Sequence, residues 1–364
     1  MNLRLGRIGR QETAAVAWIA CWICGLFSMN TQSFYEGGNI SYLTTVLSAL
    51  LSLLAVLLIA SAMRRRGCES LAALYQYAFG RVLAVVMGFL TALTLLYAAT
   101  ILLVRLLMIQ CRYVYVESEV PLVALYFFIG VLVLAWMGFE TIGRTSKLFL
   151  KLLLFGVIVV VIIAFPSFQP FRLYPLPGVG LVPLLRQSIT GTARYLPALL
   201  GLLICGVGTQ GVRHAASSAT IGAVGGGLTA GALELSIALT YPYQMLANMH
   251  SPMYRLTMAV RTGSAYLRTD KLLLFFWTLA GVLSGGYFVY AAALLVASVA
   301  DMRDIRPAVG VFATLVAALM LLGQLNLAAY ERTANALWDT AFIVMLFPPL
   351  LAALLACVRR EAAA

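Results

Sequence analysis

Long runs without Asp, Glu, Lys or Arg are the feature that most constrains this chain. A helix of about 20 apolar residues spans the ~30 Å hydrocarbon core of a bilayer. Backbone groups in lipid must bond within their own segment, so such runs form helices. The sequence therefore predicts an all-α integral membrane protein with about ten transmembrane helices. The runs cover residues 13–35, 40–63, 82–104, 120–139, 152–171, 195–212, 215–243, 272–300, 307–330 and 339–358; the seventh is interrupted once, by Glu234, and the tenth begins at Asp339.

The composition excludes several other classes of protein. Apolar residues make up 62% of the 364 positions and charged residues 10%, whereas soluble domains carry about a quarter charged residues. A soluble enzyme, a disordered protein and a nucleic-acid-binding module do not fit this balance. The net charge of +12 is interpreted as Lys and Arg placed at the membrane faces, and no nucleic-acid partner is expected.

The basic residues predict the orientation of the helices, because cytoplasmic loops are enriched in Lys and Arg. A cytoplasmic N-terminus places fifteen of the 25 basic residues on cytoplasmic segments. Both termini are then expected in the cytoplasm, which requires an even number of spans. The fifteen are Arg4, Arg7, Arg10, Arg64, Arg65, Arg66, Arg81, Arg144, Lys147, Lys151, Arg213, Arg303, Arg306, Arg359 and Arg360.

No separate soluble domain fits between the apolar runs. The longest polar segments, 172–194 and 244–271, are too short for one. The first apolar run exceeds 20 residues and lacks a small-residue cleavage pattern, so it is interpreted as a retained span. We therefore expect one membrane-embedded domain over residues 1–364.

Three charged residues lie within or beside the apolar runs: Arg105, Lys151 and Glu234. A charge in the membrane is costly and indicates a functional site by default. Glu234 is either such a group or half of a buried structural pair with Arg105 or Arg194. Arg105 can also reach the outer interface with its long side chain. Lys151 is either an anchor at the inner face or a fixed cation inside the bundle.

Small residues predict close helix packing. The seventh run contains Gly222, Gly225, Gly226, Gly227 and Gly231, and residues without side chains let helix backbones approach. The pair Cys21 and Cys24 has no second pair or nearby histidine to complete a metal site, so it is also interpreted as packing. Residues 206–211 match G-x-G-x-x-G, but membrane helices flank them, so a dinucleotide site is rejected. No catalytic residues, metal or cofactor are predicted, and the protein is not expected to be an enzyme.

Four short motifs resemble those of a known family. Residues 138–145 (GFETIGRT) resemble the G-x-E-x-I-x-R-T segment of spore germination permeases, the B subunits of GerA-type germinant receptors. Residues 173–180 (LYPLPGVG) resemble the family's LxPxxGxG approach to the sixth span. Residues 265–270 (AYLRTD), followed by Trp277, resemble its segment before the eighth span, and residues 8–12 (IGRQE) resemble its opening.

The resemblance implies a fold and a ligand site. The family is similar to amino acid/polyamine/organocation permeases, whose leucine-transporter-type core has two inverted five-helix repeats, here about residues 10–166 and 187–358. The first and sixth spans of that core are interrupted near the midplane, where exposed backbone binds the substrate. Gly25 and Gly201 would expose backbone, and Tyr97 would donate a hydrogen bond or close the pocket. The implied pocket is formed by Cys24, Gly25, Ser28, Tyr97, Thr100, Pro197, Gly201 and Ser284. The alternative for each residue is a role in packing.

The resemblance also implies a function. A germinant-receptor membrane subunit would bind a small nutrient such as an amino acid. It would pass the response to a membrane A subunit and a lipoprotein C subunit, in the inner (cytoplasmic) membrane of the spore. The alternative is an amino acid transporter coupled to protons or sodium, with Glu234 or Lys151 as the coupling group. A structural subunit that binds nothing is a third possibility.

Overall fold

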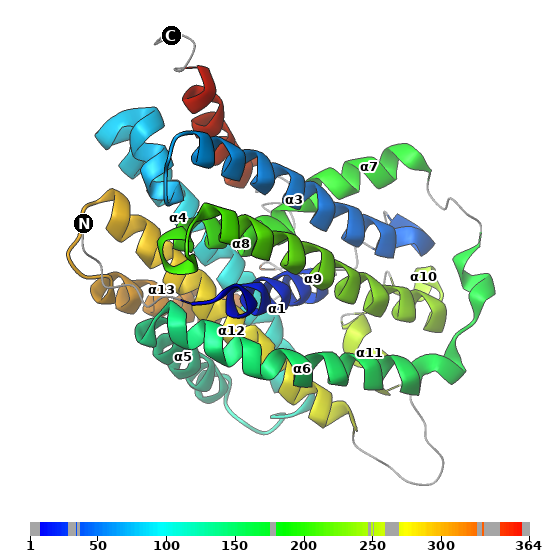
Figure 1. Ribbon diagram of the computed structural model, residues 1–364. Helices are drawn as coiled ribbons and strands as arrows, with labels where there is room; N and C mark the ends of the chain where they lie inside the picture. Colours follow the sequence, from blue (N-terminus) through cyan, green and yellow to red (C-terminus); the bar gives the residue numbers. More distant parts are fainter. Residues whose placement is uncertain are drawn as a thin grey trace.

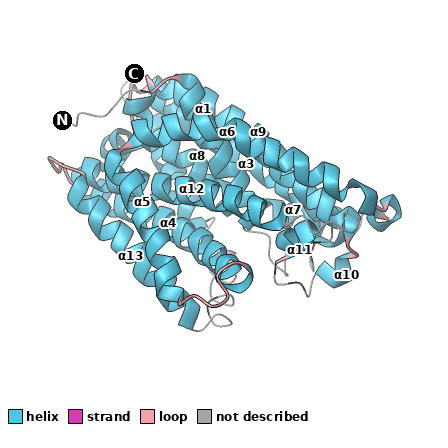
Figure 2. Cartoon of the chain, turned by 90° about the horizontal axis from the view of Figure 1, so that it is seen from below, coloured by secondary structure: helices cyan, strands magenta, loops and turns pink. Residues whose placement is uncertain are grey.

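The structure is a computed structural model that describes residues 8–27, 34, 37–174, 180–246, 249, 251–258, 269–325, 330 and 343–358. Over these residues it consists of helices and loops, without strands (Figure 2). The first half contains α1 (Arg10–Phe27), α3 (Ser41–Arg65), α4 (Leu71–Tyr113), α5 (Val120–Met137) and α6 (Phe139–Ala164). The second half contains α7 (Leu181–Thr190), α8 (Thr192–Ile204), α9 (Val212–Thr240), α10 (Tyr243–Leu246), α11 (Pro252–Met258), α12 (Thr269–Val299), α13 (Arg306–Leu325) and a helix over Ile343–Val358.

Eight segments of the described chain are long and apolar enough to cross a membrane. They match the second to ninth predicted runs in order. The first and tenth runs correspond to α1, which has 18 residues, and to the helix Ile343–Val358. The all-helical membrane architecture is therefore confirmed.

The sixth span begins earlier than the sequence predicted. Residues 181–190 were expected in a polar connection but form α7, and α7, α8 and the following 3₁₀ turn make one candidate span, Leu181–Thr209. The expectation failed because Arg186 is the one charged residue of α7 and was counted as a loop residue. Leu181, Leu185 and Ile189 instead recur every fourth residue and are all exposed on the surface, as suits a helix that faces lipid.

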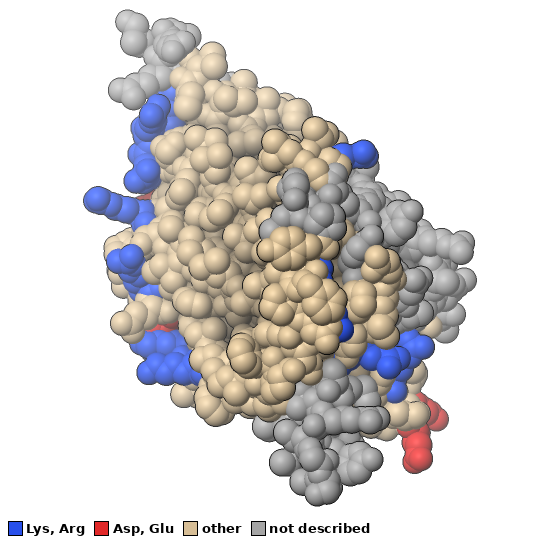
Figure 3. All heavy atoms as spheres, turned by 90° about the vertical axis from the view of Figure 1, so that its right-hand side faces the viewer, with Lys and Arg blue, Asp and Glu red and all other residues tan. Residues whose placement is uncertain are grey.

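The outer surface of the bundle is apolar. On α5, Leu125, Ile129 and Val133 are 47–48% exposed and lie one helical turn apart. The face of the molecule in Figure 3 is largely free of charge, with basic groups near its edges. Such a surface is stable in contact with acyl chains, because lipid tails are as apolar as the side chains themselves.

The segments predicted to be cytoplasmic gather at one end of the bundle. The Ile8 amide before α1 donates to the Gly208 carbonyl before α9, at 3.0 Å. The Arg66 Nε after α3 donates to the Ala356 carbonyl near the end of the last described helix, at 2.7 Å. The opposite end carries α7, α10 and α11 (Figure 1). This grouping fits the predicted topology, while the side on which the cytoplasm lies stays a prediction.

Glycines of α9 let three helices pack closely. A Cβ at Gly222 would clash with the α1 backbone at Ala17, and one at Gly225 would lie 2.6 Å from the Trp18 ring. On the other side of α9, a Cβ at Gly231 would lie 2.6 Å from Val46 of α3. The predicted packing role of this glycine cluster is confirmed. The mostly buried α8, α9 and α12 form the centre of the bundle with α1, and α5 and α6 lie outside.

A salt bridge joins α1 to α6 just before the first predicted span. Lys147 Nζ lies 2.7 Å from Glu12 Oε1, and its hydrogen bond holds the pKa of the Glu12 carboxyl below its ordinary value. Because the pKa of Glu12 is lower in the folded than in the unfolded chain, its ionised carboxylate stabilises the fold at any pH above the unfolded-state pKa, about 4.3. This contribution is lost as the pH falls through the folded-state pKa.

We therefore expect Glu12→Gln to reduce stability by about 0.2–1 kcal/mol at pH 7, a small effect because Lys147 is half exposed. Thermal unfolding in detergent between pH 3 and pH 8 measures this effect. The difference between the melting temperatures of parent and variant should shrink as the pH falls below about 4.3, because Glu12 is then progressively protonated. A gap that stays constant over the whole range would contradict the assignment.

Candidate ligand site

The C-terminal end of α1 meets an arginine inside the bundle. Arg105 of α4 donates from Nη1 to the carbonyl oxygen of Phe27, the last described residue of α1. Its charge also acts on the phenols of Tyr97 and Tyr330. Arg105, Tyr97 and Tyr330 are each partly buried. We call Phe27, Tyr97, Arg105 and Tyr330 the α1-end cluster.

A second polar group lies beside α1. Glu234 of α9 is 1% exposed and accepts a hydrogen bond from the hydroxyl of Thr45 on α3. Arg194 of α8 attracts it electrostatically, but no ion pair within 4 Å joins Glu234 to a described residue. Of the two predicted pairings, the one with Arg105 is wrong for the described contacts, because the Arg105 guanidinium contacts the end of α1 instead. We call Thr45, Arg194, Tyr195 and Glu234 the Glu234 cluster.

Tyr195 connects the second cluster to α1. A Cβ at Gly25 would lie 2.5 Å from the Tyr195 hydroxyl oxygen and 2.7 Å from the Ala230 Cβ. Gly25 thus makes room for this phenol. Tyr195 is fully buried, and its hydroxyl has no hydrogen-bond partner among the described residues. A buried hydroxyl without a partner is costly, so this atom is suited to meet a ligand or a water molecule.

The sixth span is divided between α7 and α8 at Gly191, whose backbone keeps helical φ and ψ of −61° and −15°, while the predicted residues 197–201 lie within α8. A serine of α3 fills the space beside this glycine, because a Cβ at Gly191 would clash with the Ser48 hydroxyl. Ser48 donates to the Ser188 carbonyl at 3.0 Å, and Ser52 donates to the Thr192 carbonyl at 3.1 Å. The backbone on both sides of the interruption is therefore bonded to α3.

Pro197 and Gly201 lie inside the continuous helix α8. Proline is tolerated within membrane helices because neighbouring groups satisfy the freed backbone. A Cβ at Gly201 would clash with the Tyr287 hydroxyl of α12, which donates to the Ala198 carbonyl at 2.8 Å. Gly201 therefore serves a helix contact, and its expected exposed backbone is not present.

The first span also continues past its predicted interruption. Cys24 and Gly25 are both helical and buried, and the described part of α1 extends two residues further, to Phe27. Ser28 lies outside the described residues. The interruption of the first span therefore stays a prediction, since the residues that follow Phe27 are outside the described part of the chain.

The remaining predicted residues lie elsewhere. The hydroxyls of Thr100 and Ser284 are buried and donate to carbonyls of their own helices, at Leu96 and Ala280, both at 2.8 Å. Lys151 is exposed on α6, so the hypothesis of a buried cation is wrong for this residue. It lies on an outward face of α6, where a long side chain can reach the interface.

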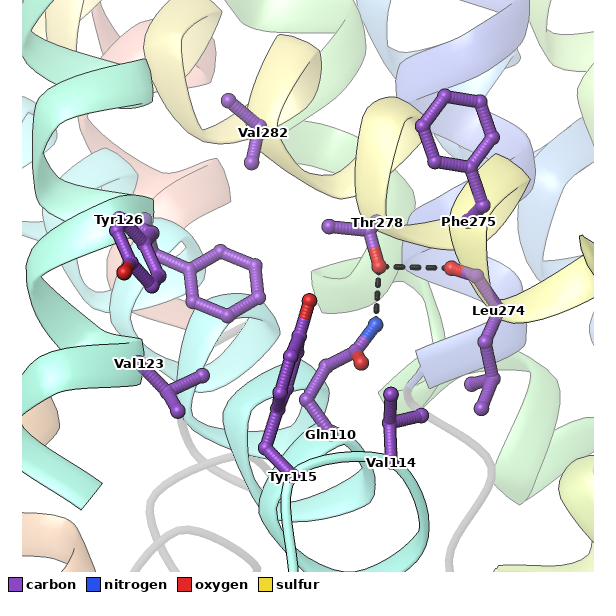
Figure 4. Close-up of a pocket in the computed structure, with 10 residues that line it drawn as sticks. Gln110, Val114, Tyr115, Val123, Tyr126, Leu274, Phe275, Thr278 and Val282 are labelled. Atoms are coloured by element: carbon purple, nitrogen blue, oxygen red, sulfur yellow. Dashed lines mark hydrogen bonds between the residues drawn. The ribbon is translucent and has the colours of Figure 1, made fainter. Parts of the chain in front are cut away.

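A cavity of about 190 Å³ opens between α4, α5 and α12 at the C-terminal end of α4, just beyond Arg105 in the chain (Figure 4). Its polar element is the pair Gln110 and Thr278, in which the amide of Gln110 donates to the Thr278 hydroxyl. Tyr115 and Tyr126 lie across from this pair in Figure 4. Its residues are separate from those of the α1-end and Glu234 clusters.

The sequence analysis missed Thr45 and Tyr195. The signal for Thr45 was present, because Ser41, Thr45, Ser48 and Ser52 recur every three or four residues and so share one face of a helix. No pattern marked Tyr195, since its place depends on the glycine opposite it in α1.

Comparisons with known proteins agree with this architecture. The sequence matches the family described as spore germination protein over residues 25–328. The fold is similar to that of a Na⁺-coupled sialic acid symporter in a substrate-bound outward-open state, with a TM-score of 0.66 and 9% identity over 94% of this chain and 79% of that chain.

A manganese transporter from Eremococcus coleocola is also similar in fold, with a TM-score of 0.57 and 13% identity over 95% of this chain and 76% of that chain. No curated protein matches the sequence. The structural likeness shows a transporter fold of the leucine-transporter type. Because the family match covers most of its length, the chain belongs to the spore germination protein family.

Proposed function

We propose that this protein is the membrane subunit of a germinant receptor and binds a small nutrient, in the first place an amino acid. The observation that carries the proposal is the family match over residues 25–328, on a chain with a transporter fold. An amino acid carries a carboxylate and an ammonium group, and the two clusters beside α1 offer one positive and one negative side chain to bind them. Arg105 can attract a carboxylate, and Glu234 can attract an ammonium group.

Binding alone does not transmit a signal. A ligand shifts a conformational equilibrium only if it binds the two states unequally. The interruption at Gly191 gives α7 and α8 a place to change their relative angle, and Tyr195 near the start of α8 reaches the end of α1. We propose that a ligand between these groups changes the α8 position, and that A and C receptor subunits in the spore inner membrane read the change.

The packing of the helices supports the two proposed repeats, residues 10–166 and 187–358. In two such repeats α1 corresponds to α8, α3 to α9, α4 to α12 and α5 to α13. Each contact between a helix of the first repeat and a helix of the second should then have a counterpart with the two repeats exchanged. The contact of α1 with α9 has its counterpart in α8 with α3, and that of α5 with α12 has its counterpart in α13 with α4. This pairing is expected for a pseudo-twofold axis in the membrane plane.

Deletion of the gene tests the proposal. Spores of the deletion strain should lose germination in response to at least one nutrient, while uptake of that nutrient by growing cells is unchanged. Re-expression of the parent chain should restore the response. Normal germination of the deletion strain on every nutrient tested would overturn the proposal.

An ion-coupled amino acid transporter is the second candidate. It is favoured by the fold likeness to a Na⁺-coupled symporter and by the buried Glu234. Accumulation of a labelled amino acid in proteoliposomes, abolished by an uncoupler or by removal of sodium, would support this function. Glu234→Gln should then abolish accumulation, whereas Lys151→Gln should leave it unchanged because Lys151 is exposed.

A further inference from the structure

The cavity between α4, α5 and α12 is built into the fold and shares no residue with the two clusters beside α1 (Figure 4). All ten side chains that line it belong to the described part of the chain. Close helix contacts shut its inner side: a Cβ at Gly130 of α5 would lie 2.8 Å from Val282, and one at Gly281 of α12 would lie 2.6 Å from Leu106 of α4. The cavity therefore lies where the three helices separate, at the end of the bundle where α4 ends and α5 and α12 begin.

A nearly buried amide gives the cavity an open hydrogen-bond acceptor. Gln110 is 5% exposed, and its Nε2 donates to the Thr278 hydroxyl. That hydroxyl donates its own hydrogen to the Leu274 carbonyl, at 2.7 Å. No described residue donates to Gln110 Oε1, and Figure 4 shows this oxygen on the side of the amide away from Thr278. A buried acceptor without a donor is costly, so the cavity is suited to a ligand that donates a hydrogen bond.

The other walls are apolar and largely aromatic. Tyr115, Tyr126 and Phe127 come from α5 and the connection before it, and Phe275 comes from α12. Aromatic rings pack favourably on one another in offset or edge-to-face arrangements. A cavity of about 150 Å³ accommodates benzene, so this cavity of about 190 Å³ has room for one aromatic ring with a short polar substituent.

Charged ligands do not suit this cavity. The described side chains that line it carry no charge, and Arg112, Glu117 and Glu119 nearby in the sequence are exposed and do not line it. Burying a charge without a partner is costly, which excludes a zwitterionic amino acid. The acyl chain of a lipid would suit the apolar walls but would leave the Gln110 oxygen without a donor.

We propose that this cavity is a second binding site, for small neutral molecules that carry a hydroxyl group on an apolar ring, such as aromatic alcohols. The ring lies among the aromatic walls, and the hydroxyl donates to Gln110 Oε1. Tyr115 and Tyr126 are 43% and 60% exposed, as is typical of tyrosines at a membrane–water interface, where molecules with an apolar body and a polar end are favoured. The site is independent of the proposed nutrient site, so either proposal can fail without the other.

Fluorine NMR of para-fluorobenzyl alcohol with the purified full chain in detergent tests the proposal. The parent should broaden the fluorine signal in a saturable way, and unlabelled benzyl alcohol should reverse the broadening. Val123 of α5 lines the cavity and is 2% exposed. Val123→Phe fills the cavity and should weaken binding at least about tenfold. Val133→Phe is the matched control, because it makes the same change on the outward face of α5, where Val133 is 47% exposed; it should bind like the parent.

A second comparison tests the hydrogen bond and does not depend on the folding of Val123→Phe. Gln110→Leu removes the acceptor, while the Thr278 hydroxyl keeps its bond to the Leu274 carbonyl. This variant should weaken binding of the alcohol about 2- to 10-fold and leave binding of para-fluorotoluene, which has no hydroxyl, unchanged or tighter.

Three results would each overturn the proposal. They are the absence of saturable binding to the parent, unchanged binding to a folded Val123→Phe variant, and an equal effect of Gln110→Leu on both probes. The last of these would indicate a site for hydrocarbon chains instead.

Discussion

Replacing Gly226 by leucine is expected to prevent stable assembly of the bundle. A Cβ at this position would lie 2.6 Å from the Cys21 Cβ, 2.7 Å from the Trp18 carbonyl oxygen and 2.8 Å from the Trp22 nitrogen. Two of these atoms belong to the backbone of α1, so no side-chain rotation relieves the contact. The whole of α1 must move away from α9, and overpacking of this kind costs about 3 kcal/mol or more.

Alanine variants give a matched pair for this prediction. Gly226→Ala should lower the melting temperature clearly, with a cost of about 1–3 kcal/mol. At Gly310 of α13 the nearest atom to an added Cβ is a Trp136 ring carbon at 3.9 Å, so Gly310→Ala should be neutral or gain slightly from helix propensity. Thermal unfolding in detergent measures both variants. Equal melting temperatures for the two would show that α1 and α9 do not approach as described.

A substitution at Gly201 is expected to act through Tyr287. The Cβ of Gly201→Ala would clash with the Tyr287 hydroxyl and displace it from the Ala198 carbonyl, to which it donates at 2.8 Å. Losing a buried hydrogen bond costs about 1–3 kcal/mol when a polar atom is left without a partner. A tryptophan at this position should prevent folding, because α8 and α12 would have to separate.

A double-mutant cycle isolates this contact. Tyr287→Phe alone should cost about 0.5–1.5 kcal/mol, the net value of a hydrogen bond. In the double variant Gly201→Ala with Tyr287→Phe, the clashing oxygen is absent, so the total cost should be smaller than the sum of the single costs. Additive costs would mean that the two residues do not interact, because distant sites are usually additive within about 0.5 kcal/mol.

The sequence predicted the helices and the close packing better than the positions of the interruptions. Apolar runs determine spans because lipid leaves the backbone no other partner, and the glycine cluster of α9 permits the close approach of α1 and α3. Pro197 and Gly201 were expected to mark the interruption of the sixth span. The structure divides it at Gly191, where Ser48 and Ser52 of α3 donate to the carbonyls of Ser188 and Thr192. That partner lies about 140 residues away and no local pattern reveals it.

For the charged residues too, the sequence predicted their location in the membrane but not their contacts. The sequence placed Arg105 and Glu234 in the membrane, and both lie partly or fully inside the bundle. It could not tell that Arg105 meets the end of α1 while Glu234 meets Thr45. For Lys151 the sequence left two alternatives open, because a charge near the end of a span can point into the bundle or away from it. Only the packing of α6, whose Lys151 side faces outward, decides between the two.

Nutrient binding by the purified chain tests the central claim most directly. We would screen amino acids, sugars and nucleosides by thermal unfolding, since binding to the folded state raises apparent stability as RT ln(1 + [L]/Kd). At least one nutrient should raise the melting temperature of the parent, and Tyr97→Phe and Arg105→Gln should reduce that shift while Arg112→Gln keeps it. No shift with any nutrient at millimolar concentration, or a shift that all three variants retain, would contradict the account.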